Sequence, residues 1–129
     1  MSYALFLDDI REPKQVKWVD LPPYDWTIVR NYKEFTRTIE ARGLPYFIAF
    51  DHDLSLEHYV HNTVVTDSKE KTGSDCALWL IDYCIKHDKD VPKFVVHSMN
   101  PAGVISIKSK LTNYTNERAK QTKSNTQAS

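Results

Sequence analysis

The sequence has no excess charge of either sign and no long hydrophobic run. Seventeen basic residues balance seventeen acidic ones, so its net charge provides no general attraction to nucleic acid or to an anionic membrane surface. No segment approaches the ~20 apolar residues of a membrane-spanning helix, and residues 1–7 lack the basic start of a signal peptide. We therefore expect a cytoplasmic protein that binds neither a membrane nor a nucleic-acid polymer.

Cysteine is scarce as well, since Cys76 and Cys84 are the two in the chain. Both fall in a predicted helix, where a rise of about 1.5 Å per residue separates them by roughly 12 Å. That separation is too large for a disulfide. We expect two free thiols, which agrees with a reducing compartment.

The length and the hydrophobic content predict one domain. At 129 residues and 41% hydrophobic content, the chain can build one core and is too short for two ordinary domains. From Thr115 onward the residues are almost all polar, and such a segment buries too little apolar surface to fold. We therefore predict a single domain at residues 1–114, followed by a disordered polar tail at 115–129.

Four short apolar runs predict the strands of a sheet. They are Tyr3–Leu7, Trp26–Arg30, Tyr46–Phe50 and Lys93–Val96. The third run shows no alternation of apolar and polar residues, which is typical of a strand in a parallel sheet packed between helices. The proline-containing segment at 10–25 is predicted to be a loop or one helical turn.

Helices are expected between and after these strands. Asn31 is predicted to cap a helix over Tyr32–Arg42. Asp75 is predicted to cap a second helix, in which apolar residues recur at the spacing of one helix face. A third helix is expected after the turn at 98–103, ending near Tyr114. Strands that alternate with helices predict an α/β fold with a mostly parallel sheet flanked by helices.

Three of the predicted strands end in side chains that carry chemistry. Asp8 and Asp9 follow the first strand, Asp51, His52 and Asp53 follow the third, and His97 and Ser98 follow the fourth. In open parallel sheets, ligands bind beyond the carboxyl ends of the strands. We therefore expect these side chains to form the rim of a binding site.

The acidic residues of this rim predict a metal site. Aspartates gathered at two strand ends would repel one another unless a cation lay between them, and carboxylate oxygens suit Mg²⁺ or Mn²⁺. The alternative is that these aspartates cap loops and helix N-termini, which is the commoner role for a single pair. Because a second pair is present, we favour a divalent ion held by Asp8, Asp9 and Asp51.

The histidines allow two interpretations. His52 and His97 can serve as general acid and base, because imidazole titrates near neutral pH; alternatively they join the metal shell or are ordinary polar residues at strand ends. His58 and His61 lie in the polar segment 55–71, which is predicted to be a long loop, and a ligand role is less expected for them.

Arg11 and Arg30 are the candidates for binding phosphate, because a guanidinium can bind two phosphoryl oxygens at once. Ser98, Asn100 and the backbone up to Gly103 form a second candidate, since the start of a helix can hold an anion. Each has a plainer interpretation. The arginines can be surface charges, and the turn can simply cap the following helix.

Taken together, these motifs resemble the cyclic-phosphate processing receiver family. They are Leu7-Asp8-Asp9-Ile10-Arg11-Glu12-Pro13, Phe50-Asp51-His52-Asp53-Leu54, Thr72-Gly73-Ser74-Asp75-Cys76, Trp79-Leu80 and His97-Ser98-Met99-Asn100-Pro101-Ala102-Gly103. The resemblance runs from Tyr3 to about Ile107. It implies a receiver-like, flavodoxin-type fold and a role in processing cyclic phosphates, such as nucleotide signals in conflict between a phage and its host. A phage-encoded member would work in the host cytoplasm.

The resemblance also assigns residues. Compared with ordinary receivers, Asp8 and Asp9 match the acid pair that holds Mg²⁺, Asp51 matches the phosphoacceptor, and Ser98 matches the hydroxyl residue after the fourth strand. The chain shows no fifth strand ending in Lys-Pro, so the strand set is reduced and the lysine of the phosphoaspartate switch is missing. Val104 and Ser106 stand where the family usually has a polar pair after Gly103.

Three functions follow from these observations. We favour a metal-dependent phosphoesterase acting on a small cyclic nucleotide phosphate. Its catalytic residues would be Asp51, His52, Asp53, His97 and Ser98, and its substrate would contact Arg11, Arg30, Asn100 and Gly103. One alternative is a non-catalytic module that binds a nucleotide or a partner. Another is a phosphoaspartyl hydrolase, because Ile48–Asp53 looks like the strand and Asp-x-Asp motif of the haloacid dehalogenase superfamily; we rank it lower because that superfamily carries the motif on its first strand.

Overall fold

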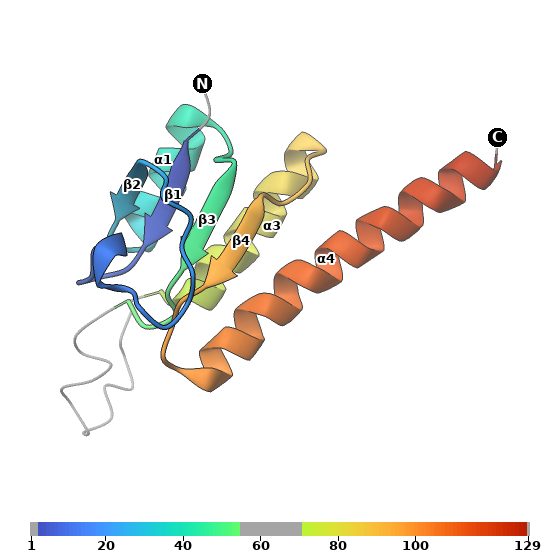
Figure 1. Ribbon diagram of the computed structural model, residues 1–129. Coiled ribbons are helices and arrows are strands. Elements are labelled where there is room, and N and C mark those ends of the chain that lie inside the picture. The colour runs from blue at the N-terminus through green and yellow to red at the C-terminus, as the bar shows by residue number, and fades with distance from the viewer. Residues whose placement is uncertain (1–2, 55–70, 129) are drawn as a thin grey trace.

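The computed structural model describes residues 3–54 and 71–128, and side chains up to residue 120. In chain order the elements are β1 (Ala4–Leu7), the 3-10 turn η1 (Pro13–Gln15), β2 (Trp26–Val29), α1 (Tyr32–Arg42), β3 (Phe47–Phe50), α3 (Gly73–His87), β4 (Lys93–Val96) and α4 (Pro101–Ala128) (Figure 1). The four predicted strands and the single turn in segment 10–25 are confirmed. His58 and His61 lie outside the described residues.

The strands form one parallel sheet in the order β2-β1-β3-β4. In its register, Leu7 lies beside Phe50 and Phe50 beside Val96, so β1, β3 and β4 end at the same level. This arrangement confirms the receiver-like α/β fold, with four strands in the described part of the chain.

The α-helices pack on one face of the sheet. A single core unites alternate residues of the strands with buried residues of all three helices: Leu5, Leu7, Ile48, Phe50, Val96, Phe35, Ile39, Cys76, Ala77, Leu80, Cys84, Ile107 and Leu111. On the opposite face, Val16, Val19 and Leu21 of the segment between β1 and β2 pack against Phe6 and Ala49. Both faces of the sheet are therefore covered, one by the helices and the other by this segment. The prolines of that segment prevent a regular helix there.

The predicted boundaries of α1 are confirmed, whereas those of α3 need correction. Asn31 caps α1 by accepting the Glu34 backbone N–H (2.9 Å). The cap of α3 is Thr72 and not Asp75. The Asp75 carboxylate accepts the Thr72 backbone N–H (2.8 Å), and the Thr72 hydroxyl accepts the Asp75 backbone N–H (3.4 Å). Because this capping box satisfies donors at both residues, the helix starts at Gly73.

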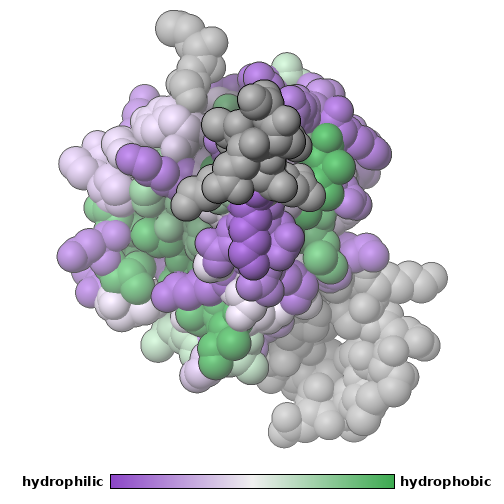
Figure 2. Space-filling model, turned by 90° about the vertical axis from the view of Figure 1, so that its right-hand side faces the viewer, coloured by the Kyte–Doolittle hydropathy of each residue, from purple (hydrophilic) through white to green (hydrophobic). Residues whose placement is uncertain are grey.

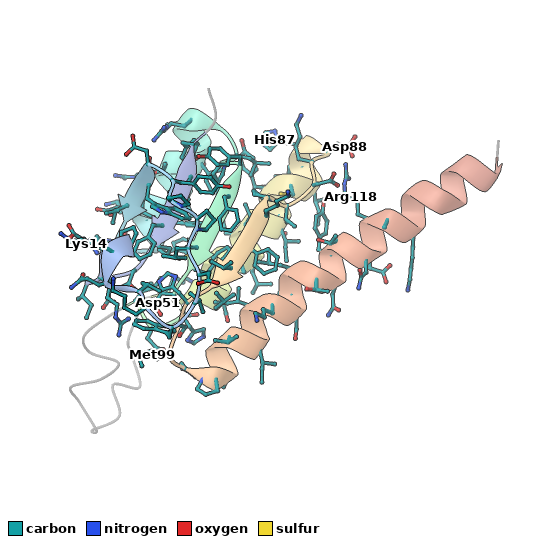
Figure 3. The ribbon with its side chains drawn as sticks, viewed as in Figure 1. Lys14, Asp51, His87, Asp88, Met99 and Arg118 are labelled. Atoms are coloured by element: carbon teal, nitrogen blue, oxygen red, sulfur yellow. The ribbon has the colours of Figure 1, made fainter. Side chains whose placement is uncertain are left out.

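Helix α4 is longer than predicted. The sequence indicated an end near Tyr114 and a disordered tail, whereas the helix continues to Ala128. Its first half packs against α3, and the Tyr114 hydroxyl donates to the Lys89 carbonyl (2.9 Å). One turn later the Arg118 side chain faces the end of α3 and pairs with Asp88 (3.0 Å) and Asp90 (Figure 3). Arg118 lies beyond Tyr114, the last large apolar residue, which explains why hydropathy alone missed this part of the helix.

Both cysteines are free, as predicted, and both are buried. Burial raises the pKa of the Cys84 thiol to about 11. Within the described ranges, no helix has both the length and the hydropathy needed to cross a bilayer. The surface on the α4 side is largely hydrophilic, with separate hydrophobic areas (Figure 2).

Candidate functional site

The sheet register places three candidate residues in one row. Asp8, Asp51 and His97 are the first residues after β1, β3 and β4. Each extends the ladder by one bond: the Asp51 N–H donates to the Leu7 carbonyl (2.9 Å) and the His97 N–H to the Phe50 carbonyl (2.9 Å). Residues that are level in a parallel sheet present their side chains on the same face. The row therefore brings two carboxylates and an imidazole together.

These three side chains form a compact, buried group. Asp8 and His97 are 0% exposed and Asp51 is 1% exposed. One ligand atom of each lies within 4.8 Å of the others, which is close enough to share a metal ion. Asp9, the remaining residue of the predicted metal set, is not part of this group, although its Oδ2 is buried without a hydrogen-bond partner in the described structure.

Asp8 is held as a carboxylate. Its Oδ1 accepts the backbone N–H groups of Ile10 (3.0 Å) and Arg11 (2.9 Å), and its Oδ2 lies 3.0 Å from His97 Nε2. Burial raises the pKa of Asp8, but these hydrogen bonds outweigh burial and lower the pKa to about 2. A hydrogen-bonded carboxylate is the better-stabilised form. Asp8 therefore contributes a fixed negative charge near neutral pH.

The surroundings of Asp51, unlike those of Asp8, disfavour its ionised form. Its Oδ1 accepts the His52 backbone N–H (2.8 Å), whereas its Oδ2 is buried with no partner among the described residues. Burial, together with the negative charge of Asp8, raises the pKa of Asp51 to about 6. A buried carboxylate oxygen without a partner is costly. Asp51 is thus the side chain of this group that most needs a cation or a proton.

His97 is oriented by two aromatic residues that the sequence analysis did not identify. The Phe6 ring stacks on the imidazole, with ring centres 4.7 Å apart and planes 6° apart. Ala49, on the strand between β1 and β4, is level with Phe6 and with Val95, and its small side chain leaves room for the stack. The Trp18 indole N–H donates to the His97 carbonyl (2.6 Å). Phe6 shares a strand face with Asp8, which is the signal that could have identified it.

The second histidine lies nearer the surface. His52 Nδ1 is 3.0 Å from Asp53 Oδ1, and each side chain is 18% exposed. The Asn100 amide contacts both carboxylate oxygens of Asp53 at 3.4 Å. His52 and Asp53 thus form a histidine–carboxylate pair, and the Asn100 amide orients the Asp53 carboxylate. Of the two predicted acid–base histidines, His52 is therefore the accessible one.

Two glycines hold the residues after β3 between the starts of α3 and α4. A side chain at Gly73 would overlap the Asp51 carbonyl, and one at Gly103 would overlap the His52 ring. The Gly73 N–H also donates to the His52 carbonyl (2.7 Å). Gly103 was predicted to contact substrate, and what the structure shows for it is close packing. Gly73 had no assigned role, although it stood in a motif.

The two predicted phosphate-binding arginines have different surroundings. Arg11 Nη1 lies 3.5 Å from Asp8 Oδ2, and the guanidinium sits over the Trp18 ring, 5.1 Å from its centre. The Arg11 side chain is 26% exposed, so it borders the site. Arg30 Nη1 instead donates to the carbonyls of Asp8 (3.1 Å) and Arg11 (2.6 Å). Arg30 therefore stabilises the turn after β1, and its contact with substrate stays a prediction.

The turn before α4 has the geometry of a helix cap. The Ser98 hydroxyl accepts the Asn100 N–H (3.1 Å), and the Asn100 side-chain oxygen accepts the Gly103 N–H (3.1 Å). Asn100 thus caps the helix while its amide contacts Asp53. The neighbouring Met99 is exposed, and its sulfur lies 3.7 Å from Arg11 Nη2, below Asp51 in Figure 3.

The comparison with known families decides what kind of domain this is. The family described as Cyclic-phosphate processing Receiver domain matches residues 3–113. The chain belongs to this family. The match covers all four strands and every candidate site residue, and it confirms the resemblance seen in the motifs. Comparisons with the curated proteins and with the solved structures found no match. The buried row at the strand ends is thus a feature of a cyclic-phosphate processing receiver domain.

Proposed function

We propose that this receiver domain hydrolyses a small cyclic nucleotide phosphate with the help of a divalent metal ion, Mg²⁺ or Mn²⁺. The observation that supports the proposal most strongly is Asp51, a fully buried carboxylate beside the ionised Asp8, with one oxygen unpartnered. Such an arrangement is destabilising in the absence of a cation and is typical of functional sites.

The reaction needs charge neutralisation, an activated water and a proton for the leaving oxygen. A divalent ion at Asp8 and Asp51 would neutralise negative charge on the phosphoryl oxygens. Arg11 borders the same carboxylates and is partly exposed, so it can add a second positive contact to the phosphate. Together, the ion and Arg11 would stabilise the negative charge that develops during attack on phosphorus.

His52 and Asp53 supply the proton transfer in this proposal. Water attacks phosphorus and loses a proton, one ester P–O bond of the ring breaks, and the departing oxygen takes a proton from His52. The proton lost by the water restores that of His52, so the product is a phosphomonoester with a free hydroxyl. His52 is partly exposed and its Nδ1 is held by Asp53, which leaves Nε2 for the substrate. His97 was an equal candidate in the sequence, but its complete burial removes it from contact with a leaving group.

The test is to incubate the protein with a panel of cyclic mono- and oligonucleotides, with Mg²⁺ or Mn²⁺, and to separate the products by chromatography. Ring-opened product is expected from the wild type and not from Asp51→Asn. The matched control is Asp82→Asn, an exposed aspartate on α3, which should keep wild-type turnover.

Two other outcomes would replace this proposal. Tight binding of a cyclic nucleotide without product, with every metal tried, would make the domain a non-catalytic binder. An acyl phosphate trapped on Asp51 would instead indicate a phosphoaspartyl hydrolase. The match to a receiver family favours that family over the haloacid dehalogenase superfamily.

A further inference from the structure

The buried group at the strand ends contains a nitrogen ligand as well as carboxylates. His97, Asp8 and Asp51 lie in one row and offer ligand atoms within 4.8 Å of one another. The aspartates alone would be only an acidic cluster. One further atom points to a ligand, because Asp51 Oδ2 is buried without a partner in the described structure. Buried polar atoms are nearly always satisfied in folded proteins, so this group is incomplete by itself.

The spacing of the donors suits an ion of ordinary bond length. His97 Nε2 and Asp8 Oδ2 are 3.0 Å apart. Bonds of about 2.0–2.2 Å at angles of about 90–109° place adjacent ligand atoms about 2.8–3.6 Å apart. A shared ion therefore requires little movement of these two side chains.

The imidazole is also held in place before any ion binds. The Phe6 ring stacks on one face of His97, and the Trp18 N–H fixes its backbone carbonyl. Both contacts restrict the imidazole before an ion binds, so less conformational freedom is lost on binding. An ordinary polar histidine at a strand end needs neither contact.

The kind of donor decides the kind of ion. Mg²⁺ prefers all-oxygen surroundings and keeps much of its water, whereas imidazole favours first-row transition metals. We propose that His97 joins Asp8 and Asp51 as a metal ligand, and that the site takes a first-row transition-metal ion, Mn²⁺ to Zn²⁺, in preference to Mg²⁺. This inference rests on the metal-dependent function proposed above and names the class of ion and the third ligand.

The first experiment measures selectivity by calorimetry. Protein freed of metal with a chelator is titrated separately with Mg²⁺, Mn²⁺, Co²⁺ and Zn²⁺. The wild type should bind one Co²⁺ or Zn²⁺ with an affinity at least about tenfold higher than for Mg²⁺. His97→Gln should lose most of this preference and keep its affinity for Mg²⁺. His87→Gln, which changes an exposed histidine at the end of α3, should behave like the wild type.

The second experiment identifies the nitrogen ligand in the wild-type protein. Pulsed electron paramagnetic resonance of bound Mn²⁺ should show coupling to a directly bound ¹⁴N, and the coupling should change when the histidines are labelled with ¹⁵N. It should persist in His52→Gln. The absence of nitrogen coupling, or its loss in His52→Gln, would overturn the assignment to His97, as would equal affinity for Mg²⁺ and the transition metals.

These outcomes separate the inference from the proposed function. Nitrogen-bound Mn²⁺ without hydrolysis of any cyclic nucleotide would support the ligand set and contradict the enzyme. Hydrolysis with Mg²⁺ and no nitrogen coupling would do the reverse.

Discussion

Replacing Asp51 with asparagine should stabilise the metal-free protein while removing its function. Burial and the charge of Asp8 raise the pKa of Asp51 from 3.8 to about 6. A pKa that is raised in the folded state means that ionisation opposes folding. The rise corresponds to about 3 kcal/mol when Asp51 is fully ionised, which is an upper limit for Asp51→Asn. We expect a gain of about 1–3 kcal/mol at pH 7.5.

The stability gained by Asp51→Asn should increase with pH. The destabilising contribution is absent below the unfolded pKa of about 4, grows as the pH rises toward about 6, and is complete above it. Asparagine keeps the side-chain oxygen that accepts the His52 N–H, and its amide replaces the unpartnered oxygen. The advantage of Asp51→Asn should therefore be large at pH 7.5 and nearly vanish at pH 4.

Urea unfolding in the presence of a chelator measures this difference, with the slope m as a check that the folded and unfolded states are comparable. Asp82→Asn serves as the control and should change little at either pH. Adding Mn²⁺ should stabilise the wild type and not Asp51→Asn, because an ion that binds only the folded state raises its stability. If Asp51→Asn is less stable than the wild type at pH 7.5, Asp51 makes a favourable interaction and the reasoning fails.

Three further predictions concern the packing around the site and the long helix. Gly103→Ala should destabilise the fold by about 1–3 kcal/mol, measured by urea unfolding, because the new methyl group would overlap the His52 ring; unchanged stability would mean that the ring moves aside freely. The buried Cys84 thiol, with its pKa raised to about 11, should react with a thiol reagent at pH 8 only after unfolding, and rapid reaction of the folded protein would contradict its burial. Arg118→Ala should speed amide hydrogen exchange in residues 115–120 of α4, because it removes the pairing with Asp88 and Asp90; unaltered exchange would show that the helix there does not depend on it.

The sequence predicted the part of the site that lies at the ends of the strands. Apolar runs that stop at aspartate or histidine identified Asp8, Asp51 and His97, because the carboxyl ends of parallel strands meet at one edge. It could not distinguish His97 from His52. That distinction depends on the register, which aligns His97 with Asp51 and leaves His52 one residue further along. Register is set by contacts between distant segments, and local pattern does not show it.

Contacts between residues far apart in the sequence explain the other features that the sequence did not predict. Trp18 lies in a proline-containing segment, and only the folded chain brings its N–H to the His97 carbonyl. The same segment covers one face of the sheet. The extension of α4 depends on Arg118 meeting residues about 30 positions earlier, and a polar segment gives no hydropathic sign of such a partner.

The most direct test of metal-dependent hydrolysis is a comparison of turnover by the wild type and Asp51→Asn on the cyclic nucleotide that the panel identifies as substrate. Both proteins are freed of metal and then supplied with Mn²⁺. The account predicts ring-opened product only from the wild type with Mn²⁺, even though Asp51→Asn is the more stable protein. Equal turnover by the two proteins, or full turnover by the wild type in excess chelator, would contradict it.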